Sequence, residues 1–183
     1  MLVPIERLFA RGTRATEVAG VKRRLRAERS RAEREDALAI RDLKLRLATA
    51  TGSVSSCASC AIGKPSPRGV FAGGDCCSSP TDGLFDDVET AALAQAGTRP
   101  RDLVTPRSEH AGCAFRGATG CTLAAEHRPT VCVRYACDGL RRELHRLGRL
   151  DDVEALALEL RQALARFAAR REARIDLAWL SGA

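Results

Sequence analysis

The sequence predicts a mainly α-helical fold with an irregular, loop-rich centre, and three observations lead to this prediction. Residues 16–48 are dense in Arg, Glu, Ala and Leu, which favour helices. From residue 151 onward, apolar residues recur at three- and four-residue steps. Between these segments, residues 49–80 are rich in Ser, Gly and Pro and residues 98–137 are irregular, and these two stretches contain all eight cysteines.

Length and composition fit one ordinary domain with an extension. The chain has 183 residues, of which 45% are apolar and only 4% aromatic, so its core is built mainly from Ala, Leu and Val. We expect a basic helical extension over residues 1–50. A small α-helical cysteine-cluster domain follows over residues 51–183 and ends in amphipathic helices. The extension has 13 basic and 7 acidic residues, so it holds +6 of the chain's net charge of +7.

Residues 16–48 are expected to form one long N-terminal helix, because they contain no proline and only one glycine. Apolar residues are sparse in the first half of this stretch, so we expect that half to be solvated. A charged, solvated surface is the plainer interpretation of its arginines. The alternative is an arm that binds an acidic protein or nucleic acid.

Three further helices have recognisable start and stop signals. Asp86-Asp87 and Gly97 bracket a short helix, and Asp138 opens another that runs to about Gly148. Asp151-Asp152 starts the final helix. The expected packing faces are Leu140, Leu144 and Leu147 in the second of these helices, and Val153, Leu156, Leu160, Leu164 and Phe167 in the third.

The pattern of hydropathy indicates a cytoplasmic protein with no membrane partner. No apolar run approaches the ~18 to 20 residues that span a bilayer, and the first 15 residues alternate charged with apolar side chains. In a reducing cytoplasm thiols persist as thiols. Eight cysteines therefore indicate metal or redox chemistry more than a disulfide framework.

The cysteines fall into two groups, Cys57, Cys60, Cys76 and Cys77, then Cys113, Cys121, Cys132 and Cys137. The first pair has the two-residue spacing that lets one turn present two sulfurs to one ion, as in structural zinc and iron–sulfur proteins. A redox dithiol is the competing interpretation, but it expects a strand before the pair and a helix carrying it. Adjacent side chains diverge, so Cys76 and Cys77 more naturally serve two ions or two metals of one cluster, or leave one of the two as a reactive thiol or as a neighbour of a ligand. All eight are our candidate metal ligands. They could fill two closed four-sulfur sites, or one cluster could use some of them and leave the others spare.

The second group lies among residues that suit a metal site. Glycines permit tight turns around an ion, and Pro129 stiffens the approach to Cys132. Four thiolates on one zinc ion leave a local charge of about −2. Arg116, Arg128 and Arg134 lie close to these cysteines in the sequence and would offset that charge.

Several short motifs in this part of the chain occur together in one family. They are Cys57, Cys60, Cys76-Cys77, Cys113-Ala-Phe115, Gly120-Cys121-x-Leu123, Arg128-Pro129-x-x-Cys132 and Tyr135-x-Cys137. With this set, residues 55–140 resemble the cysteine-cluster proteins of the YkgJ type, which are described as zinc- or iron-chelating domains. The resemblance implies metal chelation and supplies no reaction. One branch of the family resembles iron–sulfur-dependent protein lysine N-methylases.

Three functions follow from these features. The first is a metal-binding protein that chelates zinc or an iron–sulfur cluster. The second is an iron–sulfur-dependent protein-modifying enzyme similar to the lysine N-methylases. The third is a module that binds nucleic acid or an acidic protein through residues 16–48 while zinc holds its fold.

The spacing of the residues does not identify a catalytic group. His110 and His127 are alternative metal ligands, whereas His145 lies on an expected helix.

Overall fold

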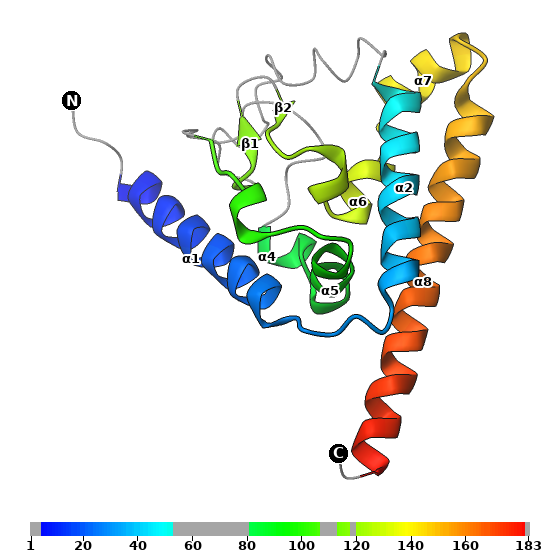
Figure 1. The fold of residues 1–183 in the computed structure, drawn as a ribbon. Coiled ribbons are helices and arrows are strands. Elements are labelled where there is room, and N and C mark those ends of the chain that lie inside the picture. Colours follow the sequence, from blue (N-terminus) through cyan, green and yellow to red (C-terminus); the bar gives the residue numbers. More distant parts are fainter. Residues whose placement is uncertain (1–4, 53–80, 107–112, 118–119, 182–183) are drawn as a thin grey trace.

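The computed structural model describes residues 5–52, 81–106, 113–117 and 120–181, and the fold is mainly helical, as predicted (Figure 1). Its α-helices are α1 (Ile5–Ala27), α2 (Arg34–Thr51), α4 (Thr81–Leu84), α5 (Asp87–Gln95), α6 (Thr130–Arg134), α7 (Asp138–Arg146) and α8 (Leu150–Leu180). The short elements are the 3-10 turns η2 (Pro100–Asp102) and η3 (Ala125–His127) and the strands β1 (Arg116–Gly117) and β2 (Gly120–Cys121). Of the helices described, none combines the length and the apolar character needed to cross a bilayer.

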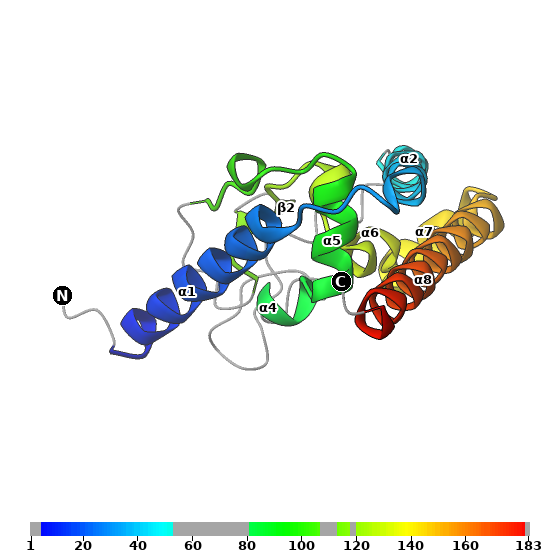
Figure 2. The same ribbon diagram turned by 60° about the horizontal axis from the view of Figure 1, so that its bottom comes forward.

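Helix α5 is the centre of the molecule. Residues 89–95 of this helix are all buried. Helix α1 packs along one side of α5, and α2 and α8 pack on the other (Figures 1 and 2). Because α5 is short and rich in alanine, helices approach it closely from both sides.

Two apolar cores meet at α5. The first joins α2, α5, α7 and α8 and includes Ile40, Leu47, Ala91, Leu140, Leu144, Val153, Leu160 and Phe167. The second joins α1, α5 and the hairpin of β1 and β2 and includes Val18, Val21, Leu25, Phe85, Leu93, Leu103, Cys113, Phe115 and Leu123. The expected 1–50 extension thus contributes side chains to both cores.

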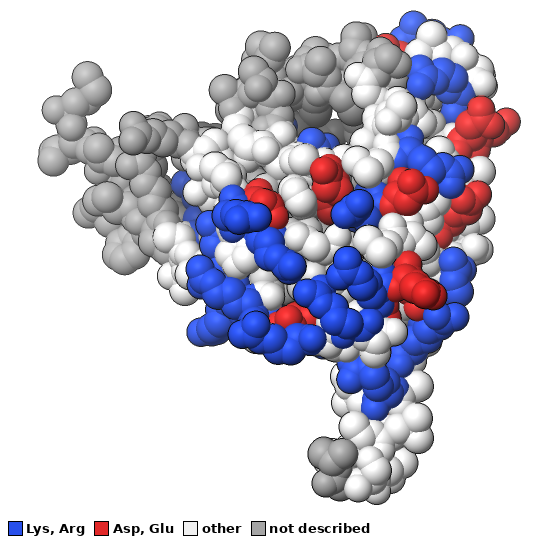
Figure 3. Space-filling view, in the orientation of Figure 1, with Lys and Arg blue, Asp and Glu red and all other residues white. Residues whose placement is uncertain are grey.

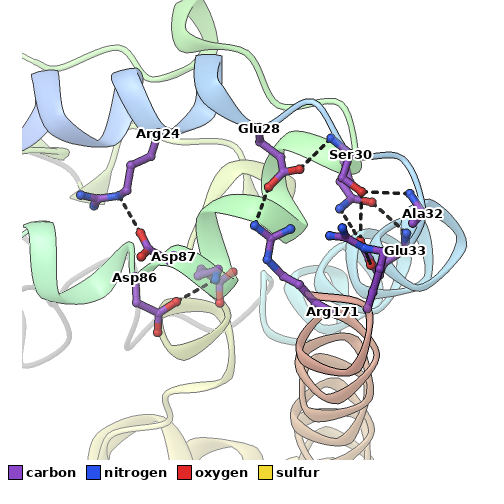
Figure 4. Close-up of polar contacts among 11 residues, drawn as sticks. Arg24, Glu28, Ser30, Ala32, Glu33, Asp86, Asp87 and Arg171 are labelled. Atoms are coloured by element: carbon purple, nitrogen blue, oxygen red, sulfur yellow. Dashed lines mark hydrogen bonds and ion pairs between the residues drawn. The ribbon is translucent and has the colours of Figure 1, made fainter. Parts of the chain in front are cut away.

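The expectation of one helix over residues 16–48 is wrong, because the chain breaks between α1 and α2. Side chains there bond to nearby backbone groups: Glu28 Oε1 accepts from the Ser30 amide at 2.8 Å, and Ser30 Oγ accepts from the Ala32 amide at 3.2 Å (Figure 4). Such bonds compete with the helical ladder. The Glu33 amide bonds instead to Gln95 Oε1 of α5, at 3.1 Å.

The expectation that the first half of this stretch is solvated is also wrong. Val18, Val21 and Leu25 on α1 are buried in the second core. Their spacing of three and four residues places them on one face of the helix. Three apolar side chains per two turns are therefore enough to dock a helix that is otherwise charged.

The start and stop signals of the other helices are confirmed. Asp86 Oδ1 caps α5 by accepting from the Glu89 amide at 2.7 Å, and Gly97 ends the helix with a φ of +107° that favours glycine. Helices α7 and α8 begin where expected. One detail is wrong: Leu147 is 51% exposed, because it is the C-terminal cap residue of α7, where the chain turns away.

A buried carboxylate holds the α1–α2 connection against α8. Glu33 Oε1 accepts from Arg174 Nε at 2.5 Å, and Glu33 Oε2 accepts from Gln95 Nε2 at 2.8 Å. Burial acts to raise the pKa of Glu33. The hydrogen bonds from Arg174 and Gln95, with the charges of Arg174 and Arg171, outweigh burial and lower this pKa below its ordinary value of 4.5.

Replacing Glu33 by glutamine should therefore destabilise the protein in a pH-dependent way. A carboxylate whose pKa is lower in the folded state adds stability above its unfolded pKa and loses it as the pH falls through the folded pKa. We expect the variant to lose about 1 to 3 kcal/mol of unfolding free energy at about pH 7, and much less at about pH 3. Urea unfolding at both pH values measures this, and a difference that does not change with pH would contradict it.

Candidate metal centre

The structure describes only the second cysteine group. Cys57, Cys60, Cys76 and Cys77 lie outside the described residues, as does His110. The expected loop over residues 49–80 is described only at its start, where α2 continues to Thr51. All four cysteines of the second group have free thiols.

Cys113 and Cys121 belong to one small hairpin. Strands β1 and β2 pair antiparallel, with Arg116 opposite Cys121. One backbone bond extends this pairing, from the Thr122 amide to the Phe115 carbonyl at 2.9 Å. A separate turn bond, from the Arg116 amide to the Cys113 carbonyl at 3.1 Å, holds Cys113 beside the start of β1. The hairpin thus places Cys121 near Cys113.

The hairpin is anchored in the second core by Phe115, which is fully buried. Its ring packs on that of Phe85, with centroids 5.5 Å apart and planes inclined by 59°. The Ala114 amide donates to Thr81 Oγ1 at 2.9 Å, so the start of α4 also holds the hairpin. Position and orientation of the Cys113 thiol follow from these contacts.

Burial raises the pKa of the Cys113 thiol above its ordinary value, and the neighbouring Cys121 raises it further. Hydrogen bonds with the Phe115 backbone and the Thr81 side chain act in the opposite direction and offset only part of this rise. Cys113 is 7% exposed. The Cys113 thiol in such a place favours its protonated form unless a cation replaces the proton.

Cys132 and Cys137 lie in different surroundings. Cys132 is on α6, and its amide donates to the Pro129 carbonyl at 3.0 Å, so the proline does lead directly into the turn that holds this thiol. Cys137 caps the start of α7 and packs against the first core. Cys113 belongs to the second core, and Cys121 packs against it.

The described residues therefore do not form a closed metal site from the second cysteine group alone. Within the part of the chain that the structure describes, no three His, Cys, Asp or Glu side chains are grouped so that they could hold a metal ion. The reason is that η3 and α6 follow the hairpin, so that Cys137 packs against the first core while Cys113 and Cys121 belong with the second. A site with ligands from both groups includes residues outside the described ranges.

The basic residues expected near the sulfurs have different roles. Arg116 is buried, with 4% exposure, and lies opposite Cys121 in the hairpin. Arg128 Nε donates to the Leu123 carbonyl at 2.8 Å, which ties η3 to the end of the hairpin. Arg134 is exposed at the end of α6.

The described histidines have structural or surface positions. His127 Nδ1 is 3.0 Å from Thr98 Oγ1, so this ring joins η3 to the end of α5. His145 is exposed on α7. Neither belongs to a group of ligands within the described ranges.

Sequence reasoning missed a buried ion pair next to Cys132. Lys44 Nζ donates to Glu89 Oε1 at 2.6 Å and to the Arg128 carbonyl at 2.8 Å, and its side chain is 1% exposed. Thr130 Oγ1 donates to the same Glu89 oxygen at 3.0 Å. Burial lowers the pKa of Lys44, while the charges of Glu89 and Cys132 act to raise it. The available signal was a lysine at an apolar position of α2, four residues after Ile40 and three before Leu47.

Comparisons with known proteins give no relative: no family model, no curated protein and no solved structure matches this chain.

Proposed function

We propose that this protein is a cytoplasmic metal-binding protein that holds zinc or an iron–sulfur cluster through cysteines of both groups. The observation that carries the proposal is the hairpin that places the half-buried Cys121 near the buried Cys113. The resemblance to cysteine-cluster chelating domains supports the same function.

The chemistry of this pair favours a metal over other uses of thiols. The buried Cys113 and the half-buried Cys121 can supply half of a four-sulfur site, and such sites bind zinc or iron tetrahedrally. A divalent cation would stabilise the thiolate of Cys113, which burial disfavours. A structural role in packing does not need two cysteines in one hairpin, because alanine or valine would fill the same space.

The first cysteine group supplies the remaining ligands in this proposal. The spacing of Cys57 and Cys60 provides a second half-site, and Cys76 and Cys77 precede α4 by a few residues. Thr81, at the start of α4, is already bonded to Ala114 of the hairpin. At Thr81, a few residues after Cys76 and Cys77, the chain therefore lies close to Cys113.

Replacing Cys121 by serine should remove the metal. We expect protein purified without oxygen to contain about one zinc ion, or one cluster, per site, and the variant to contain almost none, because a tetrahedral site loses one of four ligands. Elemental analysis measures zinc and iron, and visible absorption identifies a cluster. Thr122→Ser is the matched control, since it keeps the hydroxyl that bonds the Phe115 carbonyl at 3.0 Å.

Two results would overturn the proposal. One is a reduced, folded protein that holds neither zinc nor iron. The other is a Cys121→Ser variant with the same metal content as the wild type and the Thr122→Ser control.

A further inference from the structure

The fold separates the charges of residues 22–34. This segment contains seven basic residues and only two acidic ones. Both acidic side chains turn toward α8: Glu28 Oε2 lies 2.8 Å from Arg171 Nη2, and Glu33 Oε1 lies 2.5 Å from Arg174 Nε. Figure 4 shows Glu28 paired with Arg171 in this way. The acids of the segment are therefore neutralised by another helix and leave its arginines unbalanced.

Five of these arginines form what we call the basic face, Arg23, Arg26, Arg29, Arg31 and Arg34, and all five are exposed. None of them forms an ion pair with a described residue. The 3-10 turn η2 contacts α1, and both Arg101 in this turn and Arg99 just before it are exposed. Figure 3 shows Lys and Arg gathered over the end of α1 and the connection to α2. Glu35 is the exposed acid closest to this face in the sequence.

We propose that the basic face binds the phosphodiester backbone of double-stranded nucleic acid without reading its sequence. Guanidinium groups form paired hydrogen bonds with phosphate oxygens, which makes arginine the preferred side chain for this contact. Single-stranded binding instead relies on bases stacked on aromatic rings. Residues 22–34 contain no aromatic residue, and the exposed Tyr135 and Trp179 lie elsewhere in the chain.

The same face is poorly suited to an acidic protein. Protein interfaces depend on a few buried apolar or aromatic anchors surrounded by a polar rim. No large apolar side chain is exposed between residues 22 and 34. A purely cationic surface matches the regular charge of a nucleic acid backbone better than it matches a protein surface.

The expected binding is strongly dependent on salt. If each of the five arginines neutralises one phosphate, the logarithm of the association constant should fall with the logarithm of salt concentration with a slope of about −4 to −5. Sequence-independent binding of this kind has dissociation constants of about 10⁻⁴ to 10⁻⁶ M at physiological salt.

The test compares two variants of the full chain with equal loss of charge. Arg26, Arg29 and Arg31 are replaced by glutamine in the first. In the control, glutamine replaces Arg142, Arg161 and Arg166, which are exposed on α7 and α8 and form no ion pair with a described residue. Fluorescence anisotropy measures binding to a labelled random-sequence DNA duplex between about 50 and 200 mM salt. Circular dichroism checks that both variants are folded.

We expect the first variant to bind at least about tenfold more weakly than wild type at 100 mM salt, with the magnitude of the slope reduced by about 3. The control should stay within about twofold of the wild type. Equal losses in the two variants would show that only net charge matters and would overturn the proposal. Absent or salt-insensitive binding would overturn it too. Binding to polyglutamate as tight as binding to the duplex would assign the face to an acidic protein instead.

Discussion

Replacing Glu89 by alanine should lower the free energy of unfolding by about 3 to 5 kcal/mol, because it leaves a buried lysine without its counter-ion. Lys44 and Glu89 are 1% and 5% exposed, and their charged atoms are 2.6 Å apart. Among the described residues, Lys44 Nζ would keep only the Arg128 carbonyl without Glu89, and the Thr130 hydroxyl would lose the Glu89 oxygen. Urea unfolding followed by circular dichroism measures the change.

The double variant Lys44→Met, Glu89→Leu is the control for this prediction. It removes both charges together and fills similar volume, so its stability should lie within about 1 kcal/mol of the wild type or above it. The single variant would then be the less stable of the two. If Glu89→Ala alone cost less than about 1 kcal/mol, the pair would not be buried as the structure describes.

Replacing Phe115 by alanine should cost about 3 to 5 kcal/mol of stability and loosen the cysteine hairpin. Its ring is fully buried and packs on Phe85, and its backbone carbonyl accepts two bonds from Thr122. The cavity that the substitution creates would lie in the core that also contains Cys113. We therefore expect both a lower unfolding midpoint in urea and faster reaction of Cys113 with a thiol reagent, since local opening exposes the thiol.

Leu147→Ala serves as the matched control, because it truncates a large apolar side chain that is 51% exposed. This change should alter stability by no more than about 0.5 kcal/mol. Similar losses at the two positions would mean that Phe115 is not the anchor of the hairpin. An unchanged rate of thiol modification in Phe115→Ala would mean that the packing of Phe115 does not keep Cys113 buried.

Local signals in the sequence were sufficient for several helices. Asp86 and Gly97 mark the two ends of α5, because capping and a left-handed turn depend on residues within one helical turn. The stripe that contains Val153, Leu160 and Phe167 predicts the packed face of α8 for a similar reason, since helical periodicity sets which side chains share a face.

The break between α1 and α2 depended on residues far away in the chain. Arg, Ala and Glu dominate residues 26–34 and favour helix locally. The structure instead bonds Glu33 to Gln95 and Arg174, which lie 62 and 141 residues further on. Propensity differences of a few tenths of a kcal/mol per residue are smaller than the free energy of such buried, charge-assisted bonds.

By itself the sequence determined the helical class of this protein, the ends of its later helices and the presence of closely spaced thiols. Only the tertiary structure decided that Cys113 and Cys121 lie on one hairpin while Cys137 packs against the other core. It also decided that Lys44 is buried beside Glu89, and that the acids of residues 22–34 face α8. The physical reason is the range of the interactions: caps and helical faces are set within a few residues, whereas burial and ion pairing depend on which distant segments the two cores bring together.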